Sequence, residues 1–381
     1  VERVVNYVEQ TAEVHSKGRY EHYMLKEIHE QPKVVRDTMA AVLNTEGFAE
    51  TFIHGELAEK LAQAQCVHII ACGSSWHAGC VAKYWLESFA QIPCSVEIAS
   101  EYRYRKPVVP EHAVFIAISQ SGETADTLAA MRYAKENDYA ATLSICNVAN
   151  STMDRESDFT LMTKAGVEIG VASTKAFTAQ LVVLAMLVLR VAQLKGMDTE
   201  CIADAQQQLR QLPEAIENAL SLNPQIATMA LRLYAFQNIL FLGRGHHAPI
   251  ASEGALKLKE ISYIHAEAYA AGELKHGPLA LIDHNMPVIA LCPCGELLEK
   301  VKANLEEVRA RGGQLFILTD DGVVRGTYGK EDFRLRLNLP GSFVSPIIYN
   351  IPLQLLAYHV AYLRGTDIDQ PRNLAKSVTV E

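Results

Sequence analysis

The fold is decided by the stretch Val67-His68-Ile69-Ile70-Ala71-Cys72-Gly73-Ser74-Ser75, in which a short apolar run leads into a glycine and two serines. Similar apolar runs follow at residues 114–118, 141–145 and 159–162, separated by roughly one helix length. Short apolar runs with that spacing are typical of a parallel sheet covered by helices on both faces. The apolar stretch at residues 175–194 predicts a long helix that completes this unit.

The second half of the chain repeats this order. Residues 238–245 again place a glycine directly after an apolar run, and residues 287–291 and 315–319 match the next two runs. Residues 347–363 predict the matching long helix. Because two tandem copies of one unit are the simplest explanation, we predict an α/β protein with two doubly wound, flavodoxin-like parallel-sheet domains. Ligands of such domains bind beyond the carboxyl ends of the strands.

With 381 residues, the chain exceeds the length that one hydrophobic core usually serves. A charged stretch that Pro32 is expected to break indicates a helical and peripheral N-terminal segment. We predict five segments: residues 1–55, this helical segment or linker; residues 56–196, the first sheet domain, which carries the phosphate-binding loops; residues 197–228, a helical linker; residues 229–368, the second sheet domain; and residues 369–381, a C-terminal tail that belongs to the active site.

The charge and hydropathy of the chain exclude two kinds of partner. A formal net charge of −9 argues against nucleic acid, because binding a phosphate backbone needs clustered Lys and Arg. The longest apolar candidate for a membrane span, residues 181–191, is too short to cross a bilayer. We therefore expect neither a nucleic-acid nor a membrane partner.

Eight cysteines are scattered along the chain, several of them in apolar stretches. This usage is typical of buried thiols in a reducing compartment, so we expect a cytoplasmic protein. Cys292 and Cys294 are too close together for the usual zinc pair, and no second Cys or His pair accompanies them. We expect no metal and no other cofactor.

Two predicted strand-to-helix turns are rich in hydroxyl groups. The first carries Ser74 and Ser75 after Gly73, and the second is Ser119-Gln120-Ser121-Gly122-Glu123-Thr124. Hydroxyls and backbone N–H groups at a helix N-terminus bind anions, because the helix dipole is positive there. Helix capping explains either turn alone. Two such turns after successive strands favour a phosphate site.

A third loop, residues 166–175, precedes the long helix and is expected to wall the same site. Loops held by a rigid scaffold often carry binding residues. The alternative is an ordinary connection in which Ser173 caps the helix.

Candidate acid–base groups lie in the second half. Spacings of four and three residues put Glu253, Lys257 and Glu260 on one side of a predicted helix. A surface ion-pair ladder explains the same spacing. Downstream, residues 263–269 and 272–278 form a glycine- and alanine-rich, loop-like segment that contains His276, and an imidazole titrates near neutrality. The alternative there is a solvated loop histidine.

The C-terminal tail carries a candidate nucleophile, Lys376, where neither a long helix nor an alternating strand can be read. A primary amine can attack the carbonyl of a ketose. The hydroxyl-rich turns and the acid–base groups would supply the other parts of a sugar-phosphate site. The alternative is a solvated surface lysine.

Six motifs of this chain together resemble one known family. They are Cys72-Gly73-Ser74-Ser75, Ser119-Gln120-Ser121-Gly122-Glu123-Thr124, Glu168-Ile169-Gly170-Val171-Ala172-Ser173-Thr174-Lys175, Glu253-Gly254-Ala255-Leu256-Lys257-Leu258-Lys259-Glu260-Ile261-Ser262-Tyr263, Gly272-Glu273-Leu274-Lys275-His276-Gly277-Pro278 and Pro371-Arg372-Asn373-Leu374-Ala375-Lys376-Ser377-Val378-Thr379-Val380-Glu381. From about residue 20 onward, the chain resembles the glucosamine-6-phosphate synthase family, the glutamine:fructose-6-phosphate amidotransferases. The resemblance is to the isomerase portion, which consists of two tandem SIS domains.

The resemblance implies amino-sugar biosynthesis with fructose 6-phosphate as substrate and glucosamine 6-phosphate as product. It implies phosphate contacts from Ser74, Ser119, Gln120, Ser121 and Thr124. It implies further substrate contacts from Ser75, Val171, Ser173 and Ala375.

Catalytic roles are also implied by the resemblance. His276 would assist ring opening, Lys376 would form a Schiff base at C2, and Glu260 would move a proton between C1 and C2. Lys257 and Glu253 would act as polarising partners of Glu260. A homodimer is implied, with His276 supplied across the interface.

Three features depart from the family pattern. Ser74 stands where the family usually has threonine, and Trp76 where it usually has tyrosine. The family's N-terminal glutaminase domain has no counterpart in the sequence, and Val1 stands in place of an initiator methionine. We therefore expect an excised domain or a processed product that isomerises its substrate, with amination needing the glutaminase domain or free ammonia.

Two rival functions remain open from the sequence. A non-catalytic, sugar-phosphate-sensing SIS protein would need the two serine loops but not Glu260, His276 and Lys376 together. A simple phosphosugar isomerase would give no reason for the tail lysine.

Overall fold

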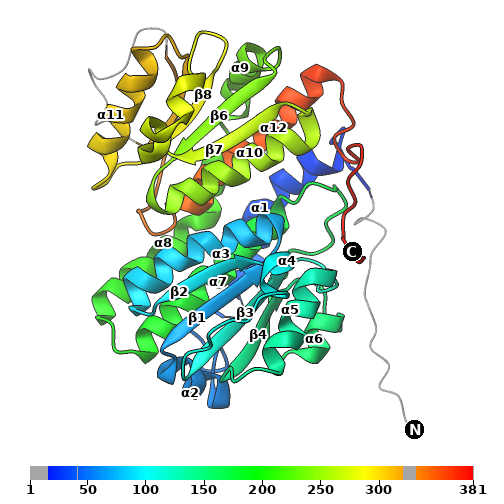
Figure 1. The fold of residues 1–381 in the computed structure, drawn as a ribbon, viewed down its shortest axis with the longest axis vertical. Coiled ribbons are helices and arrows are strands. Elements are labelled where there is room, and N and C mark those ends of the chain that lie inside the picture. The colour runs from blue at the N-terminus through cyan, green and yellow to red at the C-terminus, as the bar shows by residue number, and fades with distance from the viewer. Residues whose placement is uncertain (1–15, 41, 321–331, 381) are drawn as a thin grey trace.

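The computed structural model describes residues 16–40, 42–320 and 332–380. Within these residues the chain forms two five-stranded sheets, ordered β2-β1-β3-β4-β5 and β10-β9-β8-β6-β7, and every strand pair is parallel. The two sheet domains lie one above the other (Figure 1). The predicted fold class is confirmed.

The first sheet consists of β1 (Cys66–Ala71), β2 (Cys94–Ile98), β3 (Ala113–Ser119), β4 (Ala141–Cys146) and β5 (Phe159–Met162). The runs predicted as strands form its centre and one edge, and β1, β3 and β4 are buried throughout. The sequence analysis missed β2, an edge strand whose residues are mostly only partly buried. Because it mixes polar with apolar residues, β2 lacks the continuous apolar run of a central strand.

Two layers of helices cover the first sheet, and alternate side chains of each strand face them. Ile69 and Ile116 pack in one cluster with α3 (Gly73–Trp85) and α7 (Lys175–Leu194). Ile70 and Phe115 face the other layer, which contains α4 (Ala99–Tyr102) and α5 (Ala125–Lys135). The remaining short elements are α2 (Gly55–Gln63), α6 (Thr152–Glu156) and a π-helix at Leu86–Ala90.

Helix α7 coincides with the helix predicted at residues 175–194. Of the described helices, it alone is long and apolar enough to meet the length and composition of a membrane span. In this structure 83% of that stretch is buried inside the protein. Burial of this kind is typical of a core helix.

The second sheet consists of β6 (Asn238–Gly243), β7 (His265–Ala270), β8 (Val288–Cys292), β9 (Leu315–Asp320) and β10 (Phe333–Leu337). Its helices are α10 (Ala248–Ser262), α11 (Leu298–Arg309) and α12 (Ser345–Arg364), with short 3-10 turns at Gly245–His247, Ala271–His276 and Pro278–Leu281. The sequence analysis missed both edge strands, β7 and β10. It took β7 as loop-like, because the strand alternates alanine with polar residues instead of forming an apolar run.

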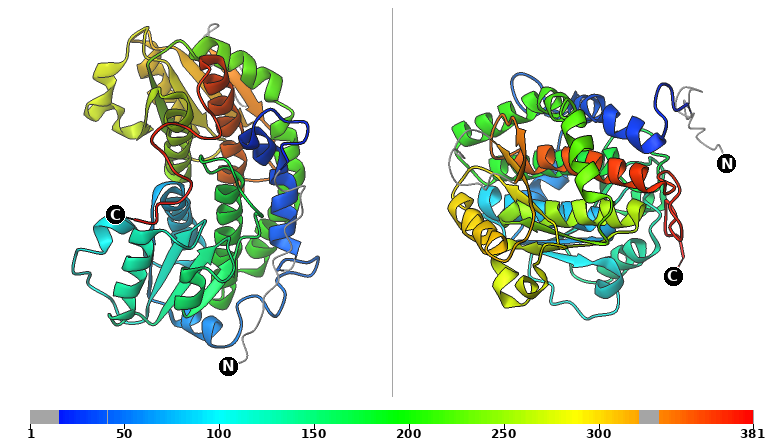
Figure 2. Two further views of the ribbon diagram at one scale, coloured as in Figure 1. Left: turned by 90° about the vertical axis from the view of Figure 1, so that its right-hand side faces the viewer. Right: turned by 90° about the horizontal axis from the view of Figure 1, so that it is seen from above.

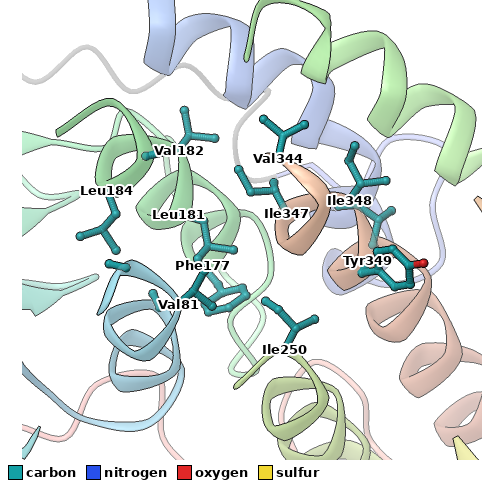
Figure 3. Packing of buried hydrophobic residues seen from close by; sticks show 14 of the residues in the cluster. Val81, Phe177, Leu181, Val182, Leu184, Ile250, Val344, Ile347, Ile348 and Tyr349 are labelled. Atoms are coloured by element: carbon teal, nitrogen blue, oxygen red, sulfur yellow. The ribbon is translucent and has the colours of Figure 1, made fainter. Parts of the chain in front are cut away.

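The two sheet domains share one hydrophobic core. A single cluster of buried side chains includes Val81 and Phe177 from the first domain together with Ile250 and Ile347 from the second. Figure 3 shows these side chains converging between α3, α7, α10 and α12. The relative position of the two domains is therefore fixed by packing rather than left to a flexible linker.

The helix within the N-terminal segment is not peripheral, which corrects that part of the prediction for residues 1–55. Helix α1 (Tyr23–Ala40) packs against α7, α8 and α12, and it continues through the buried Pro32. Proline removes one hydrogen bond of the helix, but burial of the apolar face outweighs that loss. The predicted linker forms α8 (Thr199–Leu220) and most of α9 (Asn223–Leu233). Residues 1–15 and 41 of the N-terminal segment lie outside the described residues.

The tail after α12 crosses from the second sheet domain to the first (Figure 2). The backbone carbonyl of Asp369 accepts a hydrogen bond from the Val171 N–H at 3.0 Å, and that of Val378 accepts one from the Ala125 N–H at 3.1 Å. The tail therefore lies against the third loop and against the start of α5. Glu381 lies outside the described residues.

Candidate active site

The second hydroxyl-rich turn closes on itself between β3 and α5. Ser119 Oγ lies 2.8 Å from Thr124 Oγ1 and accepts the Gly122 N–H at 3.1 Å. Gly122 has φ +66°, and an added Cβ would lie 2.1 Å from Ser151 Oγ, so only glycine fits. Thr124 occupies the N-cap position of α5, but its side chain makes no capping bond. The simple capping explanation therefore fails here, and the hydroxyls lie at a helix N-terminus without a side-chain cap, where the Val378 carbonyl of the tail accepts the Ala125 N–H.

Two other groups of this turn lie beside the tail or the neighbouring strand. Ser377 Oγ of the tail donates a hydrogen bond to Ser121 Oγ at 3.1 Å. Gln120 is half-buried, and its backbone carbonyl accepts the Asn147 N–H at 3.1 Å. The turn and the tail thus form one surface.

The first hydroxyl-rich turn points toward other helices. Gly73 adopts φ +53° where the chain enters α3. Ser74 Oγ donates to Glu253 Oε1 on α10 at 2.9 Å, and Ser75 Oγ accepts a hydrogen bond from Gln180 Nε2 at 3.0 Å. Ser74 therefore joins the first domain to the acid–base helix of the second.

The face of α10 predicted to carry acid–base groups is buried at the junction of the two domains. Glu253 and Lys257 are almost completely buried, whereas the side chain of Glu260 keeps 21% of its exposure. Lys257 Nζ lies 2.6 Å from Glu260 Oε2 and 3.5 Å from Glu253 Oε1. The alternative of a surface ion-pair ladder is wrong, because α3 and α12 enclose this face of α10 instead of leaving it in solvent.

The charges on this face stabilise one another. Burial alone would lower the pKa of Lys257, but the carboxylates of Glu260 and Glu253 outweigh burial and raise that pKa. Burial alone would raise the pKa of Glu253, but Lys257 and the hydrogen bond from His77 lower it. His77 Nδ1 lies 2.7 Å from Glu253 Oε2. Of Glu253, Lys257 and Glu260, only Glu260 is partly exposed to solvent.

Lys376 of the tail is held by the third loop. Its Nζ donates to Glu168 Oε2 and, at 2.8 Å, to the Gly170 carbonyl. Glu168 Oε1 also accepts the N–H groups of Thr174 at 2.9 Å and Ala176 at 3.0 Å, so Glu168 caps α7. The alternative in which Ser173 caps this helix is therefore wrong. The solvated-lysine alternative also fails, because the Lys376 side chain is 25% exposed and ion-paired.

Glu168 is a functional candidate that the sequence analysis missed. Burial alone would raise its pKa, but the charge of Lys376 and the two N–H groups of α7 lower it. Its charge also reaches Lys257 and helps to raise the pKa of that lysine. The available signal was an acidic residue shortly before a helix N-terminus, where a carboxylate is favourable.

The other predicted contact residues lie along the loop and the tail. Val171 and Ser173 are half-buried in the third loop, and Ala375 is exposed beside Lys376. His276 is exposed at the end of the 3-10 turn Ala271–His276. Within the described residues, no hydrogen bond or ion pair joins it to Lys376 or to the carboxylates of α10. Glu253, Lys257 and Glu260 thus lie together on α10, whereas Lys376 is bonded to the third loop, and among the described residues only the charge of Glu168 links the two groups.

A hollow of about 350 Å³ opens beside α10. It is lined by His77, Ser252, Ala255, Leu256, Lys259, Glu267, Ala268 and Tyr269. Neither hydroxyl-rich turn contributes a serine to its wall. The hollow is thus separate from the predicted phosphate surface, although His77 connects it to Glu253.

Comparison with known proteins agrees with this architecture. The SIS domain family model matches residues 60–190 and 232–364. The solved C-terminal domain of glucosamine-fructose-6-phosphate aminotransferase from Francisella tularensis is 50% identical, with a TM-score of 0.91. That match covers 93% of this chain and 100% of the solved chain.

Two curated relatives carry the name glutamine–fructose-6-phosphate aminotransferase [isomerizing]. The protein from Pectobacterium atrosepticum is 56% identical over 376 residues, which are 96% of this chain and 60% of the relative. The protein from Pseudomonas syringae pv. tomato is 55% identical over 387 aligned positions, which are 100% of this chain and 62% of the relative. The chain thus spans about 60% of the length of these relatives.

The fold and the matched family model define a protein with two SIS domains. Within that class, the chain belongs to the glutamine–fructose-6-phosphate aminotransferase family, in the part that corresponds to its C-terminal domain. The resemblance drawn from the six motifs is confirmed.

Proposed function

We propose that this chain is the sugar-phosphate isomerase portion of a glutamine–fructose-6-phosphate aminotransferase, acting on fructose 6-phosphate. The observation that carries this proposal is the position of Lys376, which a carboxylate and a carbonyl hold beside the hydroxyl-rich turn. A sugar whose phosphate rests on that turn would place its carbonyl carbon near the amine.

The phosphate end of the substrate is assigned to the first domain. The hydroxyls of Ser119, Ser121 and Thr124 would supply donors, and the N-terminus of α5, which has no side-chain cap, would supply a favourable dipole. Gln120 lies in the same turn. Ser74 would have to release Glu253 before its hydroxyl could reach the phosphate. Ser75, Val171, Ser173 and Ala375 are assigned to the remainder of the sugar.

The covalent step is assigned to Lys376. Its ammonium must first lose a proton, after which the amine adds to C2 and loss of water gives the Schiff base. Glu168 and the Gly170 carbonyl orient Nζ before that step. Orientation of this kind lowers the entropic part of the barrier.

Proton transfer is assigned to Glu260. Water or ammonia must first displace Lys376 from C2, which gives the open-chain ketone or its imine and frees the amine. Glu260 would then take the proton from C1 and return one at C2, while Lys257 and Glu253 hold its position and charge. His276 would assist ring opening from the neighbouring subunit of a homodimer, which is consistent with its exposure and its separation from the other groups in one chain.

The complete reaction needs ammonia. In the full-length enzyme we assign its supply to a glutaminase domain, which would yield glucosamine 6-phosphate in the cytoplasm. The present chain alone would isomerise fructose 6-phosphate to glucose 6-phosphate. A non-catalytic sensor is the less favoured function, because it gives no reason to bury Lys257 between two carboxylates at a cost in desolvation.

Conversion of fructose 6-phosphate to glucose 6-phosphate without glutamine tests the proposal. We expect the parent chain to turn over and Lys376→Ala and Glu260→Gln to lose activity while still binding the phosphosugar. Binding without turnover in all three proteins would support the sensor and overturn the assigned chemistry.

A further inference from the structure

The N-terminal helix reaches the lysine site through one buried carboxylate. Glu27 of α1 is 2% exposed, and it lies against the third loop. Its Oε1 accepts the N–H groups of Ile169 and, at 3.3 Å, of Gly170. Its Oε2 also lies 3.3 Å from the Gly170 nitrogen. One of these two donors, Gly170, is also the residue whose carbonyl accepts the Lys376 ammonium.

The fit between the helix and the loop depends on glycine. A Cβ added to Gly170 would lie 2.9 Å from Glu27 Oε2 and 3.6 Å from the Met24 nitrogen. A side chain there would displace the Glu27 carboxylate and touch the backbone of α1. The contact is therefore a close backbone approach rather than a loose surface contact.

The tail closes this arrangement into a ring of three segments. The Asp369 carboxylate accepts the N–H groups of Tyr23 and Met24, both at 2.9 Å, and so caps the N-terminus of α1. The Asp369 carbonyl accepts the Val171 N–H. Thus α1 holds the loop, the loop holds Lys376, and the tail that carries Lys376 holds α1.

Several charges face Glu27 from these segments. Glu168 repels it, whereas Lys376 and Lys175 attract it, and Lys175 is itself paired with Glu30 at 2.7 Å. Lys26 belongs to the same helix and lies 3.6 Å from Glu30. Three carboxyl groups and three lysines therefore lie around the loop. A carboxylate in this place interacts with the lysine site as well as with the backbone.

We propose that Glu27 is a positioning residue for Lys376, which fixes the loop at residues 168–170 and thereby sets the direction in which Nζ points. This inference rests on the proposed function and deepens it. Glu27 acts through the backbone and touches no reacting atom. It should therefore govern the rate of Schiff-base formation and not the affinity for the phosphate end of the substrate.

The test compares Glu27→Ala and Glu27→Gln with Asp37→Ala, which removes an exposed carboxylate from the same helix. For Glu27→Ala we expect kcat for fructose 6-phosphate isomerisation to fall about tenfold or more, with KM within roughly twofold of the parent, because one misplaced group costs this much in orientation. Glu27→Gln keeps one acceptor and should lose less. Asp37→Ala should match the parent.

A second measurement keeps the inference separate from the proposed function. Hydrogen exchange of the peptide that contains residues 168–171 should accelerate in Glu27→Ala and not in Asp37→Ala, whether or not the chain turns over. If the parent chain were inactive, only the proposed function would be contradicted, because the exchange measurement does not depend on turnover. Parental kcat and parental exchange in Glu27→Ala would overturn the positioning role, as would a loss of activity explained entirely by a smaller folded fraction.

Discussion

Both sheets are parallel and doubly wound, but the polar groups beyond the carboxyl ends of their strands are bonded differently. In the first domain, Ser119 and Thr124 bond to each other and leave the N-terminus of α5 without a side-chain cap. In the second domain, Asp320 Oδ1 accepts the Cys294 N–H at 2.6 Å and the Tyr349 hydroxyl at 3.0 Å. Asp320 at the second edge is thus bonded to groups that follow a strand and lie in a core helix, whereas the hydroxyls at the first edge bond to one another and to Ser377 of the tail.

The two copies of the fold thus contribute different kinds of groups to the candidate site. The second domain contributes the side of a helix, α10, instead of a ligand-binding edge. Ser74 and His77 of the first domain then meet Glu253 of that helix. Under the proposed function, the first domain would bind the substrate and the second would supply charge beside it.

The largest effect is expected from removing the amine. Lys376→Ala should lower the isomerisation rate by on the order of 10³-fold or more, because the covalent route is lost. Lys300→Ala removes an exposed lysine of the second domain and serves as the control. Steady-state assays check both variants. An equal loss of isomerisation rate in the two variants, or little loss in Lys376→Ala, would contradict the different roles proposed for the two domains.

Lys257→Met should lower the free energy of unfolding by about 3–5 kcal/mol, because it leaves Glu253 buried without its cation. Lys33→Met breaks an exposed pair with Asp37 and should change stability little. Urea unfolding of both variants measures the difference. Similar midpoints would show that the buried face of α10 does not join the domains electrostatically.

The pH dependence of stability tests the contact between Glu27 and the third loop of the first domain. Burial, followed by the nearby charge of Glu168, raises the pKa of Glu27 to about 7. Since the folded pKa lies above the ordinary value of 4.5, the stabilisation from the protonated form is complete below about pH 4.5 and is lost as the pH rises through about 7.

The parent should therefore lose stability relative to Glu27→Gln between pH 5 and pH 8, by on the order of 1–3 kcal/mol. Urea midpoints at several pH values measure this difference. Glu296→Gln, which alters an exposed carboxyl of the second domain, should track the parent. A Glu27→Gln difference that stays constant over this range contradicts the prediction.

The smallest effect is expected at the phosphate turn. Ser119→Ala should raise KM for fructose 6-phosphate about tenfold, the usual effect of losing one hydrogen bond to a charged group. Ser345→Ala removes the hydroxyl that lies 3.2 Å from His247 Nε2 in the second domain, and it should leave KM unchanged. Equal changes in KM would mean that the two edges do not differ in binding.

The sequence predicts the parts of the fold that depend on local pattern. Buried central strands appear as apolar runs, and the long apolar segment at residues 175–194 appears as α7. The edge strands β2, β7 and β10 escape prediction because their side chains are partly solvated. Helix α1 was misplaced because Pro32 breaks a helix only where packing does not compensate.

The features of the candidate site likewise fall into those that local sequence predicts and those that it does not. Glycine and serine turns after strands can be found from local sequence, and so can the spacing of Glu253, Lys257 and Glu260. The burial of that helix face could not be found, because it depends on α3 and α12 packing from distant parts of the chain. Glu27 was missed because its contact with Ile169 spans more than a hundred residues of sequence, and so does the contact of Glu168 with Lys376, although the bonds of Glu168 to the start of α7 are local.

The central claim is that Lys376 is the amine that bonds to the substrate. It is tested most directly by incubating the chain with fructose 6-phosphate, reducing with borohydride and locating the modified residue by mass spectrometry of its peptides. The account predicts a reduced sugar-phosphate adduct on Lys376 and none in Lys376→Ala. An adduct confined to another lysine, or no adduct in a parent that still isomerises the sugar, would contradict it.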